Sequence, residues 1–394
     1  MGVAIVSDWF GSGGGLSAYS EIVADLYAEM GFNAIKVGLI SKDNVDVHFN
    51  TAPSILGRFH DQLLFKELKK LKKNRKIEFA HANILNASHG FTFANAAKKL
   101  NLPYILTAHS YIFLCPIEMY CRLPDLVPCE KPFANSHCLK CVISNSKREN
   151  YALRKSTPSL FRMVYNAYSL RYLMKHAKYV ISPSKIFIAL IERTLKLENK
   201  IGYLPNPLPS EFLEISPQFK GDGSVFFWGR LEFAKGTHLL MSLAKMLPQV
   251  PIHVIGRGND ANWIIKNKPI NIVYHGFAEK PELIKMAEKA SVVVVPSIGC
   301  EMFPYTTSEA FALGKPVVAF DIAGPKEQIE ESSGGLLAKP FDIEDFSEKV
   351  KWLLENPFEA SNMGECARNY AERFLHPSRY SKQLKKLLHT YSLN

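Results

Sequence analysis

The sequence predicts an α/β protein that consists of two doubly wound units of similar size. Short apolar stretches rich in β-branched residues alternate with stretches whose apolar residues recur at helical spacing, and this alternation is typical of parallel sheets covered by helices. The alternation restarts after residues 201–209, which contain three prolines and are expected to form a hinge. The length of 394 residues also suits two domains, because a domain usually has about 150 residues.

The expected elements follow this alternation along the chain. A first strand at residues 3–6 leads into a glycine-rich loop at 11–15 and a helix at 16–30. The C-terminal segment 377–393 has apolar residues on one side and lysines on the other, as in an amphipathic helix. The expected domains are 1–203, 204–375 and the helix 376–394. The other expected strands are 34–37, 78–81, 104–107 and 179–181 in the first unit, and 224–228, 252–255, 272–274, 291–295 and 317–320 in the second.

Composition excludes several protein classes. An apolar share of 47% and a charged share of 22% are close to globular averages, which excludes a disordered or fibrous chain. No apolar stretch approaches the roughly 20 residues of a membrane span, and the N-terminus lacks the features of an export signal, so we expect a soluble, cytoplasmic protein. The net charge of +11 favours an anionic partner such as nucleic acid, anionic lipid or a phosphorylated substrate.

The segment 300–316 places two carboxylates around the start of an expected helix. Glu301 follows the strand 291–295, and Glu309 lies about one turn into a helix that Thr306 or Thr307 would cap and Gly314 would end. The free amides at the start of such a helix attract anions such as a diphosphate, and a carboxylate accepts hydrogen bonds from sugar hydroxyls. The alternative interpretation is a capped surface helix with two solvated glutamates.

Two cations follow the first strand of the second unit. Arg230 and Lys235 lie at the carboxyl edge of the expected sheet, where they would hold phosphate oxygens and stabilise a departing diphosphate. Taken singly, an arginine and a lysine in a loop are more often solvated charges.

The order of these motifs resembles a known family. Gly229-Arg230 and Lys235-Gly236 are followed by the segments 255–258 and 275–277 and then by the two glutamates. This order is similar to that of the retaining nucleotide-sugar transferases of glycosyltransferase family 4, which have the GT-B fold. The similarity spans nearly all of the second unit and extends into the first through the segments 13–15, 81–83, 107–109 and 182–184.

The resemblance implies a function and a role for each matching residue. It implies two Rossmann-like domains that face a central cleft, with a C-terminal helix that packs back on the N-terminal domain. Arg230 and Lys235 would bind the donor diphosphate, Glu309 the ribose hydroxyls, and Glu301 and His109 the transferred sugar. The implied catalytic residues are His109, Glu301, Arg230 and Lys235, and the implied donor-binding residues are Gly14, Gly15, Arg230, Lys235, Gly258, Phe277, Phe303, Tyr305, Thr306, Thr307 and Glu309.

Two positions depart from the family pattern. Pro304 stands where the family usually has glycine, and Gly324-Pro325 replaces a usual glycine pair. No Asp-x-Asp motif is well placed to hold a catalytic metal, since the segment 342–345 lies outside the expected cleft. The resemblance therefore implies front-face transfer without a catalytic metal, in which Arg230, Lys235 and the helix end supply the positive charge.

Five of the seven cysteines lie between Cys115 and Cys141. We expect a structural zinc site in an insertion at 115–141, because Cys138 and Cys141 have metal-like spacing and intracellular clustered thiols favour zinc over disulfides. The resemblance implies the ligands Cys115, Cys129, Cys138 and Cys141, with Cys121 able to exchange roles with Cys115. Free thiols, disulfides and an iron–sulfur cluster remain alternatives.

The sequence thus leaves two function classes. The leading one is a retaining hexosyltransferase (EC 2.4 class) that moves a hexose from a nucleotide sugar to a glycan or lipid-linked acceptor and has no nucleic-acid partner. The lysine-rich run 65–76 could bind an anionic membrane surface, which would place the protein on the inner face of the membrane. The alternative interpretation of this run is a solvated helix face. The alternative class is a zinc-containing nucleic-acid-binding protein on an α/β scaffold.

Overall fold

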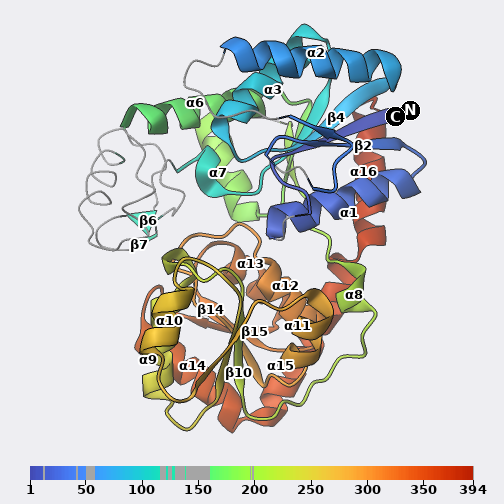
Figure 1. The fold of residues 1–394 in the computed structure, drawn as a ribbon. Coiled ribbons are helices and arrows are strands. Elements are labelled where there is room, and N and C mark those ends of the chain that lie inside the picture. The colour runs from blue at the N-terminus through green and yellow to red at the C-terminus, as the bar shows by residue number, and fades with distance from the viewer. Residues whose placement is uncertain are drawn as a thin grey trace. The chain divides into compact units, whose positions relative to one another are not determined.

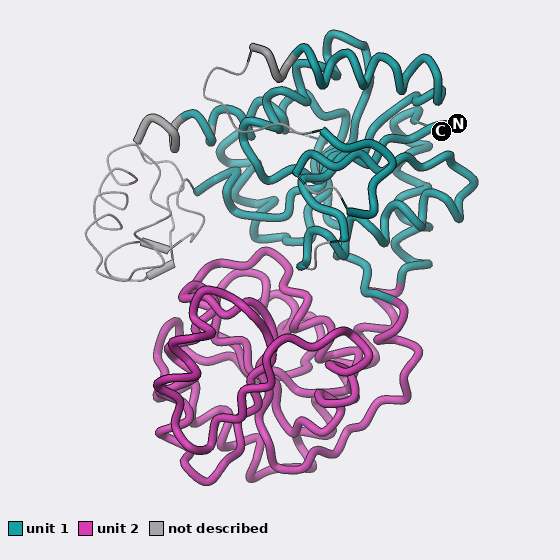
Figure 2. The backbone as a smooth tube through the Cα atoms, viewed as in Figure 1, with its two compact units in different colours: residues 1–116, 158–209, 377–394 teal, residues 117–157, 210–376 magenta. Residues whose placement is uncertain are grey.

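The computed structural model describes residues 1–11, 14–40, 43–49, 58–115, 160–195 and 199–393, together with residues 121–122, 127–128, Cys138 and Leu197. The chain divides into two compact units, drawn in two colours in Figure 2. Residues 1–116, 158–209 and 377–394 form the first unit, and residues 210–376 belong to the second. From the sequence, the second domain is expected to begin at residue 204 and the C-terminal helix at residue 376.

The first unit contains a parallel sheet with strand order β3-β2-β1-β4-β5-β8-β9. The five expected strands are present, and the sequence analysis missed the short edge strands β3 and β9. Residues 201–203 were wrongly assigned to the hinge: Ile201 is buried and pairs with Val180, so the sheet continues up to the first proline. The strands are β1 (Gly2–Ser7), β2 (Asn33–Gly38), β3 (Val47–His48), β4 (Ile77–Asn83), β5 (Tyr104–Thr107), β8 (Tyr179–Ser182) and β9 (Ile201–Tyr203).

Helices pack together in two groups around this sheet (Figure 1). Helix α3 packs against both α2 and α6, and α1 packs against the C-terminal helix α16. The bounds are α1 (Gly15–Glu29), α2 (Arg58–Asn74), α3 (Ala87–Lys99), α6 (Leu160–His176), α7 (Lys185–Leu195) and α16 (Pro377–Thr390), with a 3₁₀ turn at Tyr111–Phe113. A short antiparallel pair is formed by β6 (Cys121–Arg122) and β7 (Val127–Pro128).

The amphipathic pattern of α16 is confirmed. Tyr380, Leu384 and Leu388 are buried and Leu387 is half-buried, while Lys382, Lys385 and Lys386 are exposed. The apolar face therefore returns the C-terminal segment to the first unit, as the resemblance implies. No helix among the described residues is long and apolar enough to span a membrane.

The second unit contains a parallel sheet with strand order β12-β11-β10-β13-β14-β15. Five strands were expected, and only the last, β15, was missed. The strands are β10 (Val225–Trp228), β11 (Ile252–Ile255), β12 (Ile272–Gly276), β13 (Val292–Val295), β14 (Val317–Phe320) and β15 (Gly335–Ala338). The helices are α8 (Ser210–Leu213), α9 (Thr237–Met246), α10 (Ala261–Asn267), α11 (Lys280–Ala287), α12 (Tyr305–Ala312), α13 (Ala323–Ser332), α14 (Ile343–Glu355) and α15 (Pro357–Phe374), with a 3₁₀ turn at Phe233–Lys235.

Each sheet has one point at which the strand order reverses. In the first unit β1 lies between β2 and β4, and in the second β10 lies between β11 and β13. Ligands of open parallel sheets bind at the carboxyl ends of the strands that meet at such a point. A site is therefore expected at the loops after β1 and β4 in the first unit. In the second unit it is expected at the loops after β10 and β13.

Candidate active site

The structure brings together two predicted residues at the reversal point of the second sheet. Lys235 comes from the loop after β10, and Glu301 comes from the loop after the neighbouring strand β13. The Lys235 ammonium forms an ion pair with Oε2 of Glu301. The hydroxyl of Ser297 donates to Oε1 of the same carboxylate at 2.5 Å. Glu301 is thus held in one orientation, and the ammonium lies next to it.

Helix α12 starts two or three residues earlier than expected. It begins at Tyr305 with Pro304 at the N-cap position, so the expected cap by Thr306 or Thr307 is wrong. Thr306 instead donates its hydroxyl to the carbonyl oxygen of Trp228 at 3.1 Å, which ties the first turn to the end of β10. The first turn contains no acidic residue and no side-chain cap. A helix start of this kind suits an anion.

The end of α12 follows the sequence prediction. Gly314 is left-handed, with φ of 71°, and donates to the carbonyl of Phe311, while Lys315 donates to that of Ala310. A glycine after the helix relieves the strain of this conformation.

Glu309 lies one turn into α12 and contacts β10. The indole nitrogen of Trp228 donates to its Oε2 at 2.7 Å. Burial raises the pKa of the Glu309 carboxyl to about 7, and the hydrogen bond from Trp228 and the charge of Lys280 only partly oppose this rise. The carboxylate consequently changes charge near neutral pH.

Arg230 is not part of this cluster in the structure. Its guanidinium is 67% exposed and lies 3.3 Å from the carboxylate of Glu232. Phe277 is also half-exposed, with the guanidinium of Arg257 at 4.4 Å from the centre of its ring. Phe303 is buried and Tyr305 is half-buried. These predicted side chains come from the loops that follow β10, β12 and β13 and from the first turn of α12.

Close backbone approach explains two glycines near the strand ends. Gly256 has φ of 148°, and a Cβ atom there would lie 1.9 Å from the carbonyl oxygen of Gly229. At Gly258 it would lie 2.3 Å from the carbonyl oxygen of Leu231. No larger side chain fits at either position without moving the loop after β10, which carries Arg230.

In the first unit His109 follows β5. Its Nε2 lies 3.4 Å from Oδ1 of Asn83, which ends the neighbouring strand β4, and the edge of its ring packs on Tyr19 at 4.4 Å between centroids. Burial, with a smaller effect of His81, lowers the pKa of His109 to about 3. A neutral ring can donate one hydrogen bond and accept another, which suits contact with a sugar hydroxyl.

A buried chain of hydrogen bonds lies behind His109, and sequence reasoning missed it. Thr107 receives contacts from both the Tyr19 hydroxyl at 2.8 Å and Nε2 of His81 at 2.7 Å. The hydroxyl of Tyr27 lies 3.1 Å from Nδ1 of His81, and that of Tyr380 is hydrogen-bonded to Tyr19. Thr107 and His81 belong to the segments that carry the family resemblance, whereas no sequence signal joins Tyr19 to Tyr380.

The glycine-rich loop after β1 is only partly described. Gly14 is the N-cap of α1, has φ of 116°, and a Cβ atom there would meet nothing within 4 Å. Gly15 is the first residue of α1, while Gly13 lies outside the described residues. The backbone at Gly14 is therefore open to a close approach by a ligand.

The expected zinc ligands are only partly described. Cys115 is buried and Cys138 is half-buried, while Cys129 and Cys141 lie outside the described residues. Within the described part of the chain, no group of three or more histidine, cysteine, aspartate or glutamate side chains could hold a metal ion. The acidic segment 342–345 has a structural role, because Asp342 accepts from the amides of Glu344 and Asp345 and caps α14.

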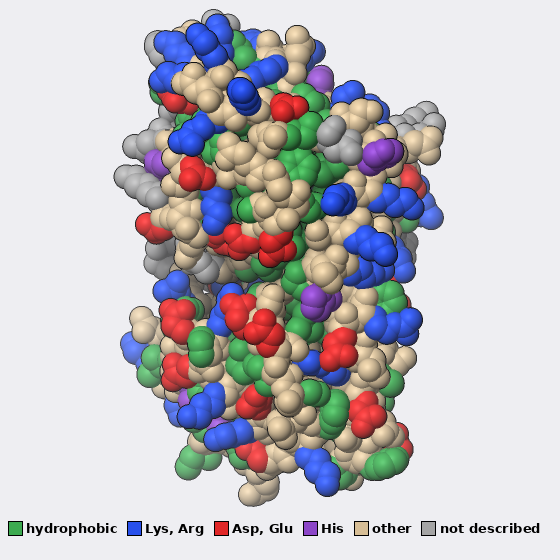
Figure 3. All heavy atoms as spheres, turned by 90° about the vertical axis from the view of Figure 1, so that its right-hand side faces the viewer, with side chains coloured by type: hydrophobic (Ala, Val, Ile, Leu, Met, Phe, Trp, Pro, Cys, Tyr) green, Lys and Arg blue, Asp and Glu red, His purple; other side chains and the backbone are tan. Residues whose placement is uncertain are grey.

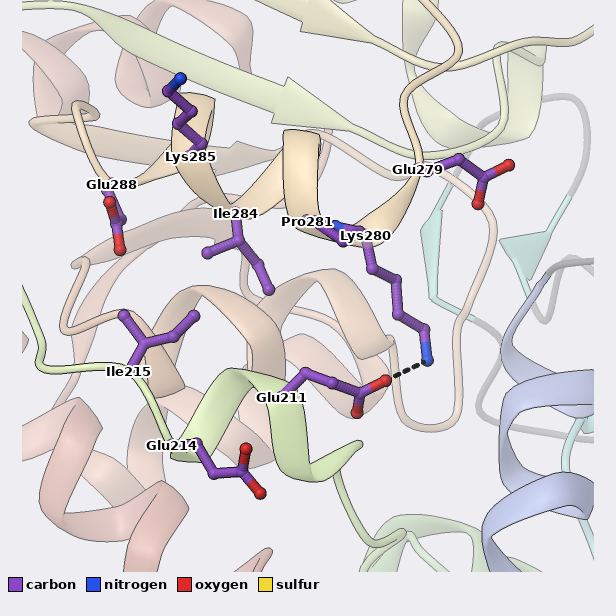
Figure 4. Close-up of a pocket in the computed structure, with 9 residues that line it drawn as sticks. All are labelled: Glu211, Glu214, Ile215, Glu279, Lys280, Pro281, Ile284, Lys285 and Glu288. Carbon is purple, nitrogen blue, oxygen red and sulfur yellow. Dashed lines mark hydrogen bonds and ion pairs between the residues drawn. The ribbon is translucent and has the colours of Figure 1, made fainter.

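A separate hollow of about 670 Å³ lies between α8 and α11 in the second unit (Figure 4). Lys280 crosses it and forms an ion pair with Glu211 at 3.2 Å. None of the predicted site residues lines it. The lining residues are Glu211, Glu214, Ile215, Glu279, Lys280, Pro281, Ile284, Lys285 and Glu288.

Part of the chain is similar in sequence to known proteins. Residues 210–370 match the family model of the group 1 glycosyl transferases. An exopolysaccharide phosphotransferase of Streptomyces coelicolor is 29% identical over 205 residues, which are 48% of this chain and 21% of that protein. A glycogen synthase of Mycobacterium tuberculosis is 27% identical over 157 residues, 38% of each protein. These matches thus cover less than half of either relative.

Solved structures match the whole chain. Sucrose-phosphate synthase of Thermosynechococcus elongatus superposes with a TM-score of 0.77 at 16% identity, covering 99% of this chain and 98% of that one. Anabaena HepE, solved in complex with UDP-glucose, superposes with a TM-score of 0.70 at 16% identity, covering 98% and 99%. The protein therefore has the two-domain GT-B fold of these solved structures, and its residues 210–370 match the group 1 glycosyl transferases in sequence.

Proposed function

We propose that this protein is a retaining hexosyltransferase that uses a nucleoside-diphosphate sugar as donor. The observation that carries the proposal is the convergence of Lys235, Glu301 and the uncapped start of α12 at the reversal point of a group 1 glycosyl transferase domain. An ammonium and free helix amides suit a diphosphate, and Glu309 in the same helix suits the ribose. HepE, which shares the fold, was solved with UDP-glucose, so a UDP-sugar is the first donor to test.

A panel of UDP-, GDP- and ADP-sugars tests the donor. A ligand that binds only the native state raises the melting temperature of the protein. We expect one nucleotide series to stabilise the purified protein and the other two to have little effect. If no nucleotide sugar raises the melting temperature or releases nucleoside diphosphate, the proposed function is wrong.

The mechanism follows from the charges of the site. Lys235 and the α12 amides would stabilise the negative charge that develops as the bond between sugar and diphosphate breaks. Arg230, which pairs with Glu232 in this structure, would add its charge once it turns toward the diphosphate. Glu301 and His109 would contact the transferred sugar. The departing phosphate oxygen accepts the proton of the acceptor hydroxyl, whose oxygen bonds to the anomeric carbon on the same face. Proton NMR of the first product should show the anomeric configuration of the donor, and an inverted product would exclude this route.

We also propose that transfer needs no metal at the catalytic centre. The side-chain cations and the helix start would supply the positive charge that a metal supplies in other transferases. Activity should therefore survive a chelator that removes added Mg²⁺ and Mn²⁺. Loss of activity with EDTA and its recovery with one of these ions would contradict this part of the proposal.

The acceptor side is proposed to lie near an anionic membrane surface. Helix α2 exposes Lys66, Lys69, Lys70 and Lys73, and basic side chains gather at the top of the view in Figure 3, where α2 lies. Such a surface suits a glycan or lipid-linked acceptor that is held at anionic lipid. Vesicles with 30% anionic lipid should bind the protein, and Lys69→Glu/Lys73→Glu should weaken this binding. Equal binding to neutral vesicles would contradict it.

A structural zinc ion at Cys115, Cys129, Cys138 and Cys141 remains a proposal. A site of this kind would stabilise the segment 115–141 and would take no part in the chemistry. Metal analysis of the purified protein should find one zinc per chain, and Cys138→Ser should remove it. The absence of bound zinc would refute the proposal.

A further inference from the structure

We propose that Trp228 is a positioning residue for the nucleotide: its indole N–H fixes the carboxylate of Glu309 so that the second oxygen receives the ribose hydroxyls. The inference rests on the proposed function and adds to it a residue that determines ribose recognition. Trp228 is the last residue of β10, at the reversal point of the sheet, and is only 4% exposed.

The geometry assigns one oxygen to each task. The indole nitrogen of Trp228 donates to Oε2 of Glu309 at 2.7 Å, a short distance that is typical of a hydrogen bond to a charged acceptor. Among the described residues, Trp228 donates the hydrogen bond that the Glu309 carboxylate accepts. A carboxylate can accept about four hydrogen bonds. Oε1 is therefore the oxygen that remains for a ligand.

The strand and the helix are also joined through the backbone. The hydroxyl of Thr306, in the first turn of α12, donates to the carbonyl oxygen of Trp228 at 3.1 Å. One residue of β10 thus contacts α12 by both its backbone and its side chain. These two contacts fix the start of α12, whose amides face the proposed diphosphate, and the carboxylate one turn later.

Burial makes this positioning necessary. An indole N–H that is buried without a partner is unfavourable, and a carboxylate that is largely removed from water depends on the hydrogen bonds it accepts. Without the indole donor, the Glu309 side chain would lose its fixed orientation and would hold its proton more strongly. Ribose recognition should then weaken even though Glu309 is still present.

The test compares two ligands that differ only in the ribose hydroxyls. The nucleoside diphosphate of the series that stabilises the wild-type protein is titrated by calorimetry beside its 2′,3′-dideoxy form. The wild-type protein should bind the dideoxy form about tenfold or more weakly, because hydrogen bonds to a charged group are lost. In Trp228→Phe this ratio should fall below about threefold, as it should in Glu309→Gln. The matched control Trp352→Phe changes an exposed tryptophan on α14 and should keep the wild-type ratio.

A second readout is the pH dependence of nucleotide binding. Binding by the wild-type protein should strengthen as the pH rises through about 7, because the pKa of the Glu309 carboxyl lies there and the ionised group is the better acceptor. The indole N–H favours the ionised form, so the midpoint should move to higher pH in Trp228→Phe. The charge of Lys280 on α11 also acts on this carboxyl and is unchanged in the variant.

The outcomes separate this inference from the proposed function. If the wild-type protein binds no nucleotide, the proposed function is wrong and the inference falls with it. If the wild-type protein discriminates and Trp228→Phe discriminates equally, only the inference is overturned. Should Trp228→Phe fail to fold, 3-benzothienylalanine at position 228 keeps the shape of the indole and replaces its N–H by sulfur. An unchanged ratio in that protein would also overturn the inference.

Discussion

The hydroxyl of Tyr380 in the C-terminal helix α16 is hydrogen-bonded to the hydroxyl of Tyr19 in α1, although 361 positions separate the two residues in the sequence. Both side chains are buried, and Tyr19 also contacts Thr107 at 2.8 Å. The ring of Tyr19 packs against His109. The C-terminal helix is therefore connected, through a single tyrosine, to the residues behind the histidine of the first unit.

Removing the Tyr380 hydroxyl should destabilise the first unit. Tyr380→Phe keeps the packing of the ring but leaves Tyr19 with one hydrogen bond fewer, which should lower the free energy of unfolding by about 1 kcal/mol. The control Tyr391→Phe removes a hydrogen bond to the carbonyl of Asn199 at the surface and should cost less than about 0.5 kcal/mol. Urea unfolding of both variants measures the difference. An equal loss of unfolding free energy in both variants would mean that the buried hydrogen bond stabilises the protein no more than the surface one.

Arg368 should be essential for the fold of the second unit. Its guanidinium donates to the carbonyls of Phe212 at 3.2 Å and Leu213 at 2.6 Å in α8, and to that of Ala312 at the end of α12. Arg368→Met should cost about 3 kcal/mol or more, because buried carbonyls lose their charged donor. Thermal unfolding should show this loss, with little change in Arg373→Met, whose guanidinium stacks on Phe374. A melting temperature close to that of the wild-type protein would contradict the assigned role.

Acid should destabilise the first unit through a buried histidine. Burial lowers the pKa of His81 from 6.5 to about 3, so between these values only the unfolded chain binds the proton. The stabilising contribution of the neutral ring is complete above pH 6.5 and is lost as the pH falls, by about 1.4 kcal/mol per pH unit. Unfolding free energies measured between pH 7 and about 5 should include this slope, to which His109 adds because burial lowers its pKa in the same way.

The matching variants identify the residue responsible. His81→Gln should reduce the slope, because the glutamine side chain takes up no proton. His389→Gln changes an exposed histidine at the end of α16 and should leave the slope unchanged. If both variants keep the wild-type slope, another group titrates in this range.

Both sheets could be predicted from the sequence, because each central strand is a short run of buried apolar residues that is recognisable by itself. Stretches such as 292–295, with four consecutive valines, can hardly form anything other than a buried strand. The missed strands are edge strands: β3 has two residues, β9 was hidden by the prolines after it, and β15 begins with glycine. Local patterns are weak at an edge, where one neighbouring strand and the covering helices decide the structure.

The site was predictable where residues follow central strands. Lys235 and Glu301 meet because β10 and β13 are neighbours, and strand order could be anticipated from the α/β pattern. The contact between Trp228 and Glu309 was not predicted, since it depends on the direction of one side chain relative to a helix. The same holds for Arg230, whose pairing with Glu232 is a matter of side-chain orientation.

The cleavage of a nucleotide sugar at Lys235 is the central claim, and ³¹P NMR of the donor diphosphate tests it most directly. The resonances of the stabilising nucleotide sugar should be replaced by those of the nucleoside diphosphate in the presence of the wild-type protein. In Lys235→Ala, which keeps the fold, this conversion should be slower by about 10²- to 10³-fold, because the leaving group loses its stabilising charge. Lys326→Ala, which removes an ion pair with Asp321 on the surface, should react like the wild-type protein. Equal rates in Lys235→Ala and the wild-type protein, or no conversion by either, would contradict the account.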